Sequence, residues 1–279
     1  MRNSLCPRDQ TTIVFDPKPK GTAGYEAQNF SETGRRLHSG CWGRSGGELY
    51  LNLTKDQLEA AKSSLGQVLV ERYGDTLGKT LDQEVQEELK TTLGQLPNIG
   101  ATQENVWAGN MPPTALGLAT YRVLVPKYAT LEEVGRILYD IMQRETGGIT
   151  GFIMRAMYNE GAMMQKLKSL AARSQQRQYP EDWVMTFVEG AGQDFTYGVD
   201  VTECAIQKYL TKQGAPELTR YLCLTDYVSS EAMGRGLVRC KTLAEECASC
   251  DFRYKRGRPS YLYPLRDGWP PKFLASCPT

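Results

Sequence analysis

Apolar residues recur every three or four positions through the first two-thirds of the chain. The pattern covers five segments, residues 58–68, 85–93, 114–125, 134–141 and 152–173. This spacing puts the apolar side chains on one face of a helix. Each segment is therefore predicted to form a helix with one buried face.

Threonines mark the predicted starts of three of these helices. In each case Gln or Glu follows the Thr after three residues, which is the pattern of a capping box. The pairs are Thr54 with Gln57, Thr80 with Gln83, and Thr130 with Glu133. We therefore expect helices to begin at these three threonines.

The period of the apolar pattern changes after Pro180. The apolar run 182–190 is typical of a buried strand, and alternation over 195–201 is typical of a strand with one buried face. Two helices are predicted next. Thr202 is the expected cap of the first, and the second begins near Pro216.

Segments 237–243 and 250–254 are predicted to pair as an antiparallel hairpin. The fold class is therefore α+β, with a helical N-terminal two-thirds followed by a small, mainly antiparallel sheet with two intervening helices. Three regions are expected: an irregular extension over 1–48, a single domain over 49–257, and a Pro-rich tail over 258–279. The extension has seven glycines and three prolines and lacks a sustained apolar period.

Composition narrows the classes of function. Of the 279 residues, 41% are hydrophobic and 23% charged, which is ordinary for a soluble domain with a sizeable core. A net charge of +1 gives no electrostatic reason to expect nucleic acid or a membrane surface as partner. The apolar runs are too short to span a bilayer, and the N-terminus lacks the apolar segment of a secretory signal. The sequence does not indicate an oligomeric state.

The chain has one histidine, His38, and eight cysteines. A single histidine excludes zinc sites that use several, and a Ser-His-Asp or Cys-His arrangement would need His38, which stands in a Gly/Ser/Arg-rich segment typical of a loop. Eight cysteines are few for a chain of this length. Reduced thiols and a cytoplasmic location are therefore expected.

The stretch TLAEECASCDFRY contains a C-x-x-C, formed by Cys247 and Cys250. A redox pair of this kind begins a helix, whereas here a strand follows, and a zinc ribbon needs a second C-x-x-C. Strand alternation points Cys250 inward and Asp251 to the opposite face. Asp251 is then either solvated or paired with Arg239 or Arg253.

Two other cysteines occupy chemically meaningful positions. Cys204 lies at a predicted helix start beside Glu203, and Cys223 shares a helix face with Asp226. Such cysteines equally serve as small core residues. A zinc ion held by Cys204, Cys223 and Cys250 stays open but has no support from the spacing, so no metal is predicted.

An amide-rich loop follows the second predicted helix and contains Asn105 and Asn110. Loops of this composition bind polar ligands in some proteins and are only surface in others. Asn105 and Asn110 are therefore candidates for binding a substrate.

Several motifs, taken in order, resemble a known family. They are LPNIGATQEN, YRVLVPKYATLEEVGRILYD, VTECAIQKYLTKQGAPELTRYLCLTDYVSSEAMG and TLAEECASCDFRY. Together they resemble the L-2-amino-thiazoline-4-carboxylic acid hydrolase family over about residues 49–254, and more distantly the small-molecule-binding domains related to vinyl reductases. The loop before CDF differs, since Glu246 and Cys247 stand where the family pattern contains glycine.

The resemblance implies a cytosolic enzyme that adds water to a cyclic thiazoline amidine and opens it toward a carbamoyl-cysteine, with no cofactor. From the chemistry we expect Cys250 as nucleophile and Asp226 or Asp251 as acid/base. The expected substrate-binding residues are Cys204, Cys223, Glu203, Arg239, Asn105 and Asn110. The alternative is a small-molecule-binding protein, or a non-hydrolytic tailoring enzyme of a specialised biosynthetic pathway, built on the same fold.

Overall fold

The computed structural model describes residues 46–101, 104–190 and 194–260, with side chains described from residue 55 onward. The predicted extension before residue 46, His38 within it, and the tail beyond residue 260 lie outside the described residues. Within the described residues, no helix is long and apolar enough to cross a membrane.

Helices form the first part of the described chain, as predicted. They are α1 (Gly46–Tyr73), α2 (Asp75–Gly94), the 3-10 turn η2 (Val106–Asn110), α3 (Met111–Leu124), α4 (Leu131–Thr146), α5 (Gly148–Met157) and α6 (Glu160–Ser174). Successive helices pack in pairs, α1 on α2 and α2 on α3, and α4 packs on α1. Their apolar faces form one continuous buried core.

Two of the three predicted helix starts are wrong. Helix α1 begins at Gly46, so Thr54 lies within it, and α2 begins at Asp75, which puts Thr80 inside the helix with its hydroxyl donating to the Thr76 carbonyl (3.0 Å). Gly74, at a φ of 79°, is the single residue between α1 and α2, so α2 has already begun before the chain reaches Thr80. The third start is confirmed: Thr130 caps α4 with a complete capping box.

The predicted helix over 152–173 is two helices. The chain is extended at Tyr158 and Asn159, and the Asn159 side chain accepts a hydrogen bond from the Ala162 amide (2.9 Å) and caps α6. Asparagine is a favoured cap because its carbonyl satisfies a free amide of the first turn. Helix α5 is thereby separated from α6.

The second part of the chain holds the sheet. Strands β1 (Val184–Glu189), β2 (Tyr197–Glu203), β3 (Leu237–Val238) and β4 (Cys250–Tyr254) pair antiparallel in the order β1-β2-β4-β3. Between β2 and β3 lie α7 (Ala205–Lys212), the turn η3 (Pro216–Leu218) and α8 (Thr219–Met233), and η4 (Leu243–Glu245) precedes β4. This confirms the predicted α+β class.

Local signals in this part are mixed. The buried face of β2 is as predicted, with Tyr197, Val199 and Val201 all buried. The cap of α7 is Cys204 and not Thr202, because Thr202 still belongs to β2. Strand β3 is only two residues long, shorter than the predicted 237–243.

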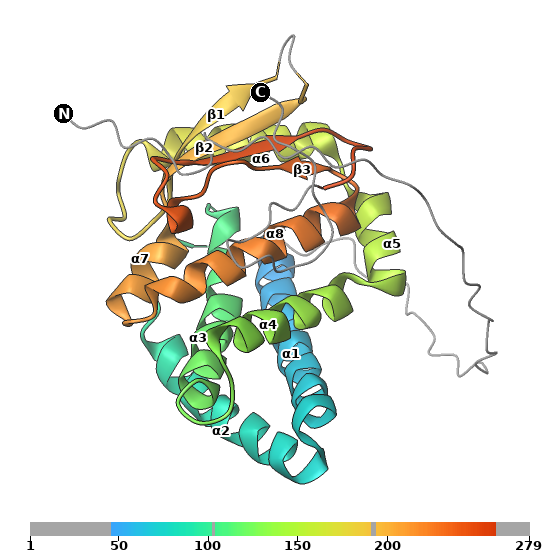
Figure 1. Ribbon diagram of the computed structural model, residues 1–279. Helices are drawn as coiled ribbons and strands as arrows, with labels where there is room; N and C mark the ends of the chain where they lie inside the picture. Colours follow the sequence, from blue (N-terminus) through green and yellow to red (C-terminus); the bar gives the residue numbers. More distant parts are fainter. Residues whose placement is uncertain (1–45, 102–103, 191–193, 261–279) are drawn as a thin grey trace, which may run out of the picture.

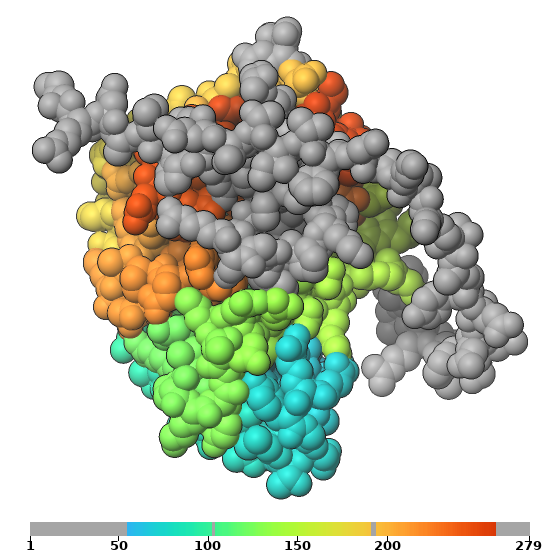
Figure 2. Space-filling model, in the orientation of Figure 1, coloured from blue at the N-terminus to red at the C-terminus, as the bar shows by residue number. Residues whose placement is uncertain are grey.

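Helix α8 is the central element (Figure 1). It crosses the molecule between α4 and the sheet, packing on α4 and contacting β3, while α6 packs on β1. The crossing with α4 is close, since a Cβ at Gly135 would lie 2.0 Å from the Tyr221 ring. Figure 2 shows the orange surface of α7 and α8 beside the green surface of α4. Both α8 and the hairpin thus lie where they can build one site.

Candidate functional site

A buried arginine lies at the junction of α8 and the β3–β4 hairpin. Arg239 follows β3 and is only 2% exposed. Its guanidinium lies between the rings of Tyr227 (5.0 Å to the centroid) and Phe252 (4.7 Å). The Tyr227 hydroxyl also donates to the Arg239 carbonyl (2.9 Å). Two rings therefore fix the position of a buried positive charge.

Arg239 uses its two terminal nitrogens on α8. One donates to Asp226 Oδ2 (2.7 Å) and the other to the Cys223 carbonyl (2.7 Å). Its Nε has no hydrogen-bond partner among the described residues. Because a buried charge is tolerated only when it is paired, Asp226 is the group that keeps Arg239 in place.

Asp226 differs from Arg239 in its access to water. Its side chain is 38% exposed, whereas that of Arg239 is 2% exposed. The ion pair therefore runs from the interior to the surface. A carboxylate in this position can exchange protons with solvent while still touching the buried cation.

Three free thiols form a cluster, and two of them, Cys223 and Cys250, interact with the arginine. Cys250 begins β4, Cys223 lies on α8 and Cys204 caps α7. Each lies close enough to another to affect its ionisation, since neighbouring thiols raise the pKa of all three. The structure therefore brings the three cysteines together with Arg239 and Asp226, five of the nine residues singled out from the sequence.

Burial keeps these thiols protonated at neutral pH. It raises the pKa of Cys204 to about 11 and those of Cys223 and Cys250 to about 12. The Arg239 charge acts in the opposite direction on Cys223 and Cys250, and the Leu243 amide donates to the Cys250 sulfur (3.2 Å). Arg239 is thus the counter-charge available to a thiolate at either position.

Asp251 faces a different way. Its Oδ1 accepts hydrogen bonds from the backbone amides of Cys240 (2.8 Å) and Lys241 (2.5 Å). Burial raises the pKa of Asp251, and these amides act against the shift. The sequence left Asp251 either solvated or paired with Arg239 or Arg253. In the structure Arg239 pairs instead with Asp226, and Arg253 pairs with Asp200 (2.8 Å).

Glu203 stands beside Cys204 in the chain but faces outward. It forms ion pairs with Lys208 (2.5 Å) and Arg177. The hydrogen bond from Lys208, followed by that from Arg177, lowers the pKa of Glu203 against the effect of burial. Its carboxylate is therefore committed to a pair of surface cations outside the thiol cluster.

The two asparagines are not part of the cluster. Asn105 is fully buried, and its side chain donates to the Ile99 carbonyl (3.1 Å) and to Asp182 Oδ1 (2.8 Å) while accepting from the Trp107 amide (3.2 Å). Asn110 ends η2, where its carbonyl accepts from the Thr114 hydroxyl (2.8 Å). Asn105 thus has a structural place, and no described hydrogen bond joins Asn110 to the cluster.

Aromatic residues that the sequence did not single out form a wall beside the thiols. Trp107 meets Trp183 edge-to-face at 5.6 Å and Phe252 at 6.1 Å, and the Trp183 side chain helps to lower the pKa of Cys204. They come from η2, the chain before β1, and β4. Their spacing along the chain contains no motif, so only the fold brings them together.

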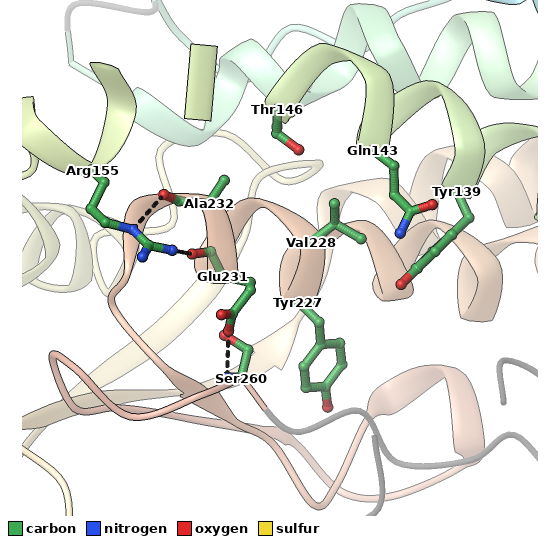
Figure 3. A pocket seen from close by; sticks show the side chains of 9 residues that line it. All are labelled: Tyr139, Gln143, Thr146, Arg155, Tyr227, Val228, Glu231, Ala232 and Ser260. Atoms are coloured by element: carbon green, nitrogen blue, oxygen red, sulfur yellow. Dashed lines mark hydrogen bonds between the residues drawn. The ribbon is translucent and has the colours of Figure 1, made fainter. Parts of the chain in front are cut away.

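A pocket of about 260 Å³ lies along α8 next to the cluster (Figure 3). Tyr227 belongs to both, because it lines the pocket and also packs on Arg239. The other lining residues are Tyr139, Gln143, Thr146, Arg155, Val228, Glu231, Ala232 and Ser260. The lining surface of the pocket is mostly apolar, and Tyr227 lies between it and the buried arginine.

The remaining cysteines of the described chain are in a different state. Cys240 and Cys247 are disulfide-bonded, so Cys247 is not a free partner of Cys250 in a redox pair. Among the residues that the structure describes, no group of three or more His, Cys, Asp or Glu side chains is arranged to hold a metal ion. Among the cysteines that the structure describes, Cys204, Cys223 and Cys250 are free thiols, as expected, and Cys240 and Cys247 are not.

Comparison with known proteins gives one match. No curated protein and no solved structure matches the chain. The model of the L-2-amino-thiazoline-4-carboxylic acid hydrolase family matches residues 115–254, which is half of the chain and includes Arg239, Asp226 and the three free thiols. The chain therefore belongs to the L-2-amino-thiazoline-4-carboxylic acid hydrolase family.

Proposed function

We propose that this protein opens a small cyclic amidine or thiazoline on an amino-acid-derived substrate, with Cys250 as nucleophile and Asp226 as acid/base. Family membership supports a hydrolase-like role. The observation that carries the proposal is a cluster of three free thiols, two of which interact with a buried arginine that pairs with a solvent-accessible carboxylate. Asp226, Arg239 and Cys250 come from different elements, so their meeting depends on the fold.

The ring carbon of a cyclic amidine is electrophilic, because it is bonded to nitrogen and sulfur. In the proposed first step the Cys250 sulfur adds to this carbon, the electrons of the C=N π bond move to the nitrogen, and the thiol proton passes to Asp226. As the C=N bond forms again, the ring bond from the carbon to its other heteroatom breaks, and the departing heteroatom takes the proton from Asp226. Water, deprotonated by Asp226, next adds to the same carbon and displaces the Cys250 thiolate, which takes that proton from Asp226, so the overall reaction adds one water to the ring.

Arg239 makes the first step feasible. A thiol with a pKa of about 12 ionises rarely at neutral pH, and a positive charge beside it stabilises the thiolate as it forms. The two rings around the guanidinium prevent it from reorienting, so its charge is in place before the reaction. Cys204 and Cys223 line the site in this proposal, and Glu203, Asn105 and Asn110 lie outside it.

The test is turnover of a panel of 2-amino-thiazolines and related cyclic imines by the whole chain, with products measured by mass spectrometry. We expect Cys250→Ala and Asp226→Asn to lower kcat by at least about 100-fold, as loss of a nucleophile or acid/base does. Asp75→Asn is the matched control, because Asp75 is an exposed carboxylate on α2 paired only with Lys79. Full turnover by Cys250→Ala would exclude the covalent step.

A second candidate function is binding without turnover. It is favoured by the same burial that keeps all three thiols protonated, since a protonated thiol is a poor nucleophile. Calorimetry with the same panel separates the two functions. If a ligand binds saturably, is recovered chemically unchanged and forms no covalent adduct with Cys250, the protein is a binding protein and the proposed hydrolysis is wrong.

A further inference from the structure

The carboxylate of Asp251 on β4 binds the backbone of the two residues that follow Arg239. Asp251 Oδ1 accepts from the amides of both Cys240 and Lys241, and the Asp251 amide in turn donates to the Lys241 carbonyl (3.3 Å). These bonds begin one residue after Arg239. They therefore determine where the backbone that carries the guanidinium can lie.

Strand β4 places Asp251 on the opposite face from the site. Its residues alternate, with Cys250, Phe252 and Tyr254 buried and Asp251 and Arg253 less so. Cys250 presents its thiol and Phe252 its ring to the side where Arg239 lies. Asp251 thus cannot act on the substrate from the side of Cys250, yet it contacts the turn that holds Arg239.

We propose that Asp251 is a positioning residue, whose carboxylate holds the turn over residues 240–241 and thereby keeps the Arg239 guanidinium against the Cys250 thiol. This proposal rests on the proposed function in one respect, that the Arg239 charge stabilises the Cys250 thiolate. It replaces the acid/base role expected for Asp251 from the sequence. The substrate does not enter the proposal.

The hydrogen bonds themselves distinguish positioning from proton transfer. Both amides donate to the same oxygen, Oδ1, and neither needs a negative charge. An asparagine keeps one carbonyl oxygen that can accept both bonds, but it cannot take up or release a proton near neutral pH. Asp251→Asn should therefore preserve a positioning role and abolish an acid/base role, whereas Asp251→Ala removes both.

The experiment measures thiol reactivity in the whole protein. Native protein is treated with iodoacetamide at fixed pH between about 8 and 9.5, where the rate follows the thiolate fraction. Peptide mass spectrometry then gives the rates at Cys250 and Cys204 from one sample. Cys204 is the internal reference, because the Arg239 charge opposes the rise in pKa at Cys250 and is not among the causes of the shift at Cys204.

We expect the ratio of the Cys250 rate to the Cys204 rate to fall about tenfold in Asp251→Ala, equivalent to one pKa unit. Arg239→Gln should give the same fall, and the double variant no further fall. Asp251→Asn should stay within about twofold of the parent chain. Asp200→Ala should do the same, because Asp200 is opposite Asp251 in the register of β2 and β4 but its carboxylate pairs with Arg253.

Two results would overturn the proposal. One is an unchanged ratio in folded Asp251→Ala. The other is an Asp251→Asn variant whose ratio falls as far as that of the alanine variant, since a negative charge or a proton on residue 251 would then be needed. If Asp251→Ala does not fold, Asp251→Ser, which can accept from one amide, takes its place and should give an intermediate ratio. Because alkylation needs no substrate, failure of the proposed reaction would leave this outcome readable.

Discussion

Arg239 shows how one side chain links stability to chemistry. Its positive charge is buried, and its partner Asp226 is the exposed member of the pair. Removing the partner leaves the charge in the interior with one terminal nitrogen unsatisfied. Removing the arginine removes the charge as well, so the two halves of this ion pair should not be equivalent.

We therefore predict that Asp226→Ala lowers the free energy of unfolding by about 2 kcal/mol, between the values for exposed and buried pairs. Arg239→Met, which keeps an apolar chain between the rings of Tyr227 and Phe252, should cost less. Urea unfolding of both variants checks the order. An alanine variant as stable as the parent would mean that solvent replaces Asp226 at no cost.

Asn105 supports a second prediction at this scale. Its side chain makes three hydrogen bonds in a fully buried position, so Asn105→Ala leaves Asp182 and the Ile99 carbonyl short of a donor. We expect a loss of about 2–3 kcal/mol in the free energy of unfolding. Asn110→Ala is the control and should change it by less than about 0.5 kcal/mol. Denaturant titration of the two variants, with kcat measured on the folded fraction, tests whether Asn105 is structural.

At the level of elements, the capping boxes give a direct comparison. Thr130 accepts from the Glu133 amide (3.2 Å) at the start of α4, whereas Thr80 lies inside α2. Thr130→Ala should therefore cost about 1 kcal/mol, as loss of a cap does, and Thr80→Ala should be near neutral. Thermal unfolding of the two variants measures the difference. Equal losses would mean that the hydroxyl at position 80 matters in a way that its place in the helix does not explain.

The elements that were predicted well are those whose signal lies in their own residues. Alternation of apolar residues alone predicted β2 and β4, and the apolar residues of both strands are buried. The early helix starts failed because a local Thr–Gln pair does not show that a helix already begins further upstream. The predicted length of β3 is wrong because the amides of Cys240 and Lys241, which would have continued the strand, donate instead to the Asp251 side chain.

The same distinction applies to the site. Cys204, Cys223, Cys250, Asp226 and Arg239 were singled out by residue type, local position and family resemblance, and the fold brings them together. The rings of Tyr227, Trp107 and Trp183 were not, because aromatic residues are common in cores and their spacing here carries no period. Which carboxylate would face Arg239 was also beyond the sequence, since it depends on the angle at which α8 meets the hairpin.

For the whole molecule, the buried thiols predict a pH dependence. A cysteine with a folded pKa of about 11 or 12 keeps its proton above pH 9, where an unfolded cysteine loses it. Between about pH 9 and pH 12 the unfolded chain binds fewer protons than the folded chain, so the free energy of unfolding falls as the pH rises. The three thiols contribute fully only below about pH 9. Their contribution is lost progressively toward pH 12.

This is measured by urea unfolding at pH 8 and pH 10 for the parent chain and for Cys204→Ala. Each thiol can lower the free energy of unfolding by up to about 1.4 kcal/mol for every unit by which the pH rises in this range. The alanine variant should therefore lose less stability over that interval than the parent chain. Equal losses would place Cys204 in contact with water. Tyr209 and Tyr254, whose pKa values are raised to about 12, act in the same direction in both proteins and cancel in the comparison.

Cellular location also belongs to this scale. A cytoplasmic location stays a prediction, and the disulfide-bonded Cys240 and Cys247 are more typical of oxidising compartments. The free thiols near Arg239 are all partly or fully buried, so they can stay reduced in either setting. The chemistry proposed for the site is therefore independent of the compartment.

Strand β4 has a consequence for how this protein can vary. Three successive residues of this strand lie on alternating faces: Cys250 supplies a thiol, Asp251 a carboxylate that binds two backbone amides, and Phe252 a ring. Insertion of one residue would exchange the faces, turning a carboxylate toward the guanidinium and the thiol away from it. Changes in length must therefore be absorbed before the strand, in residues 242–249. Among relatives, insertions and deletions should accordingly occur in that loop. The five residues of β4 should tolerate substitution but not a one-residue shift in strand register.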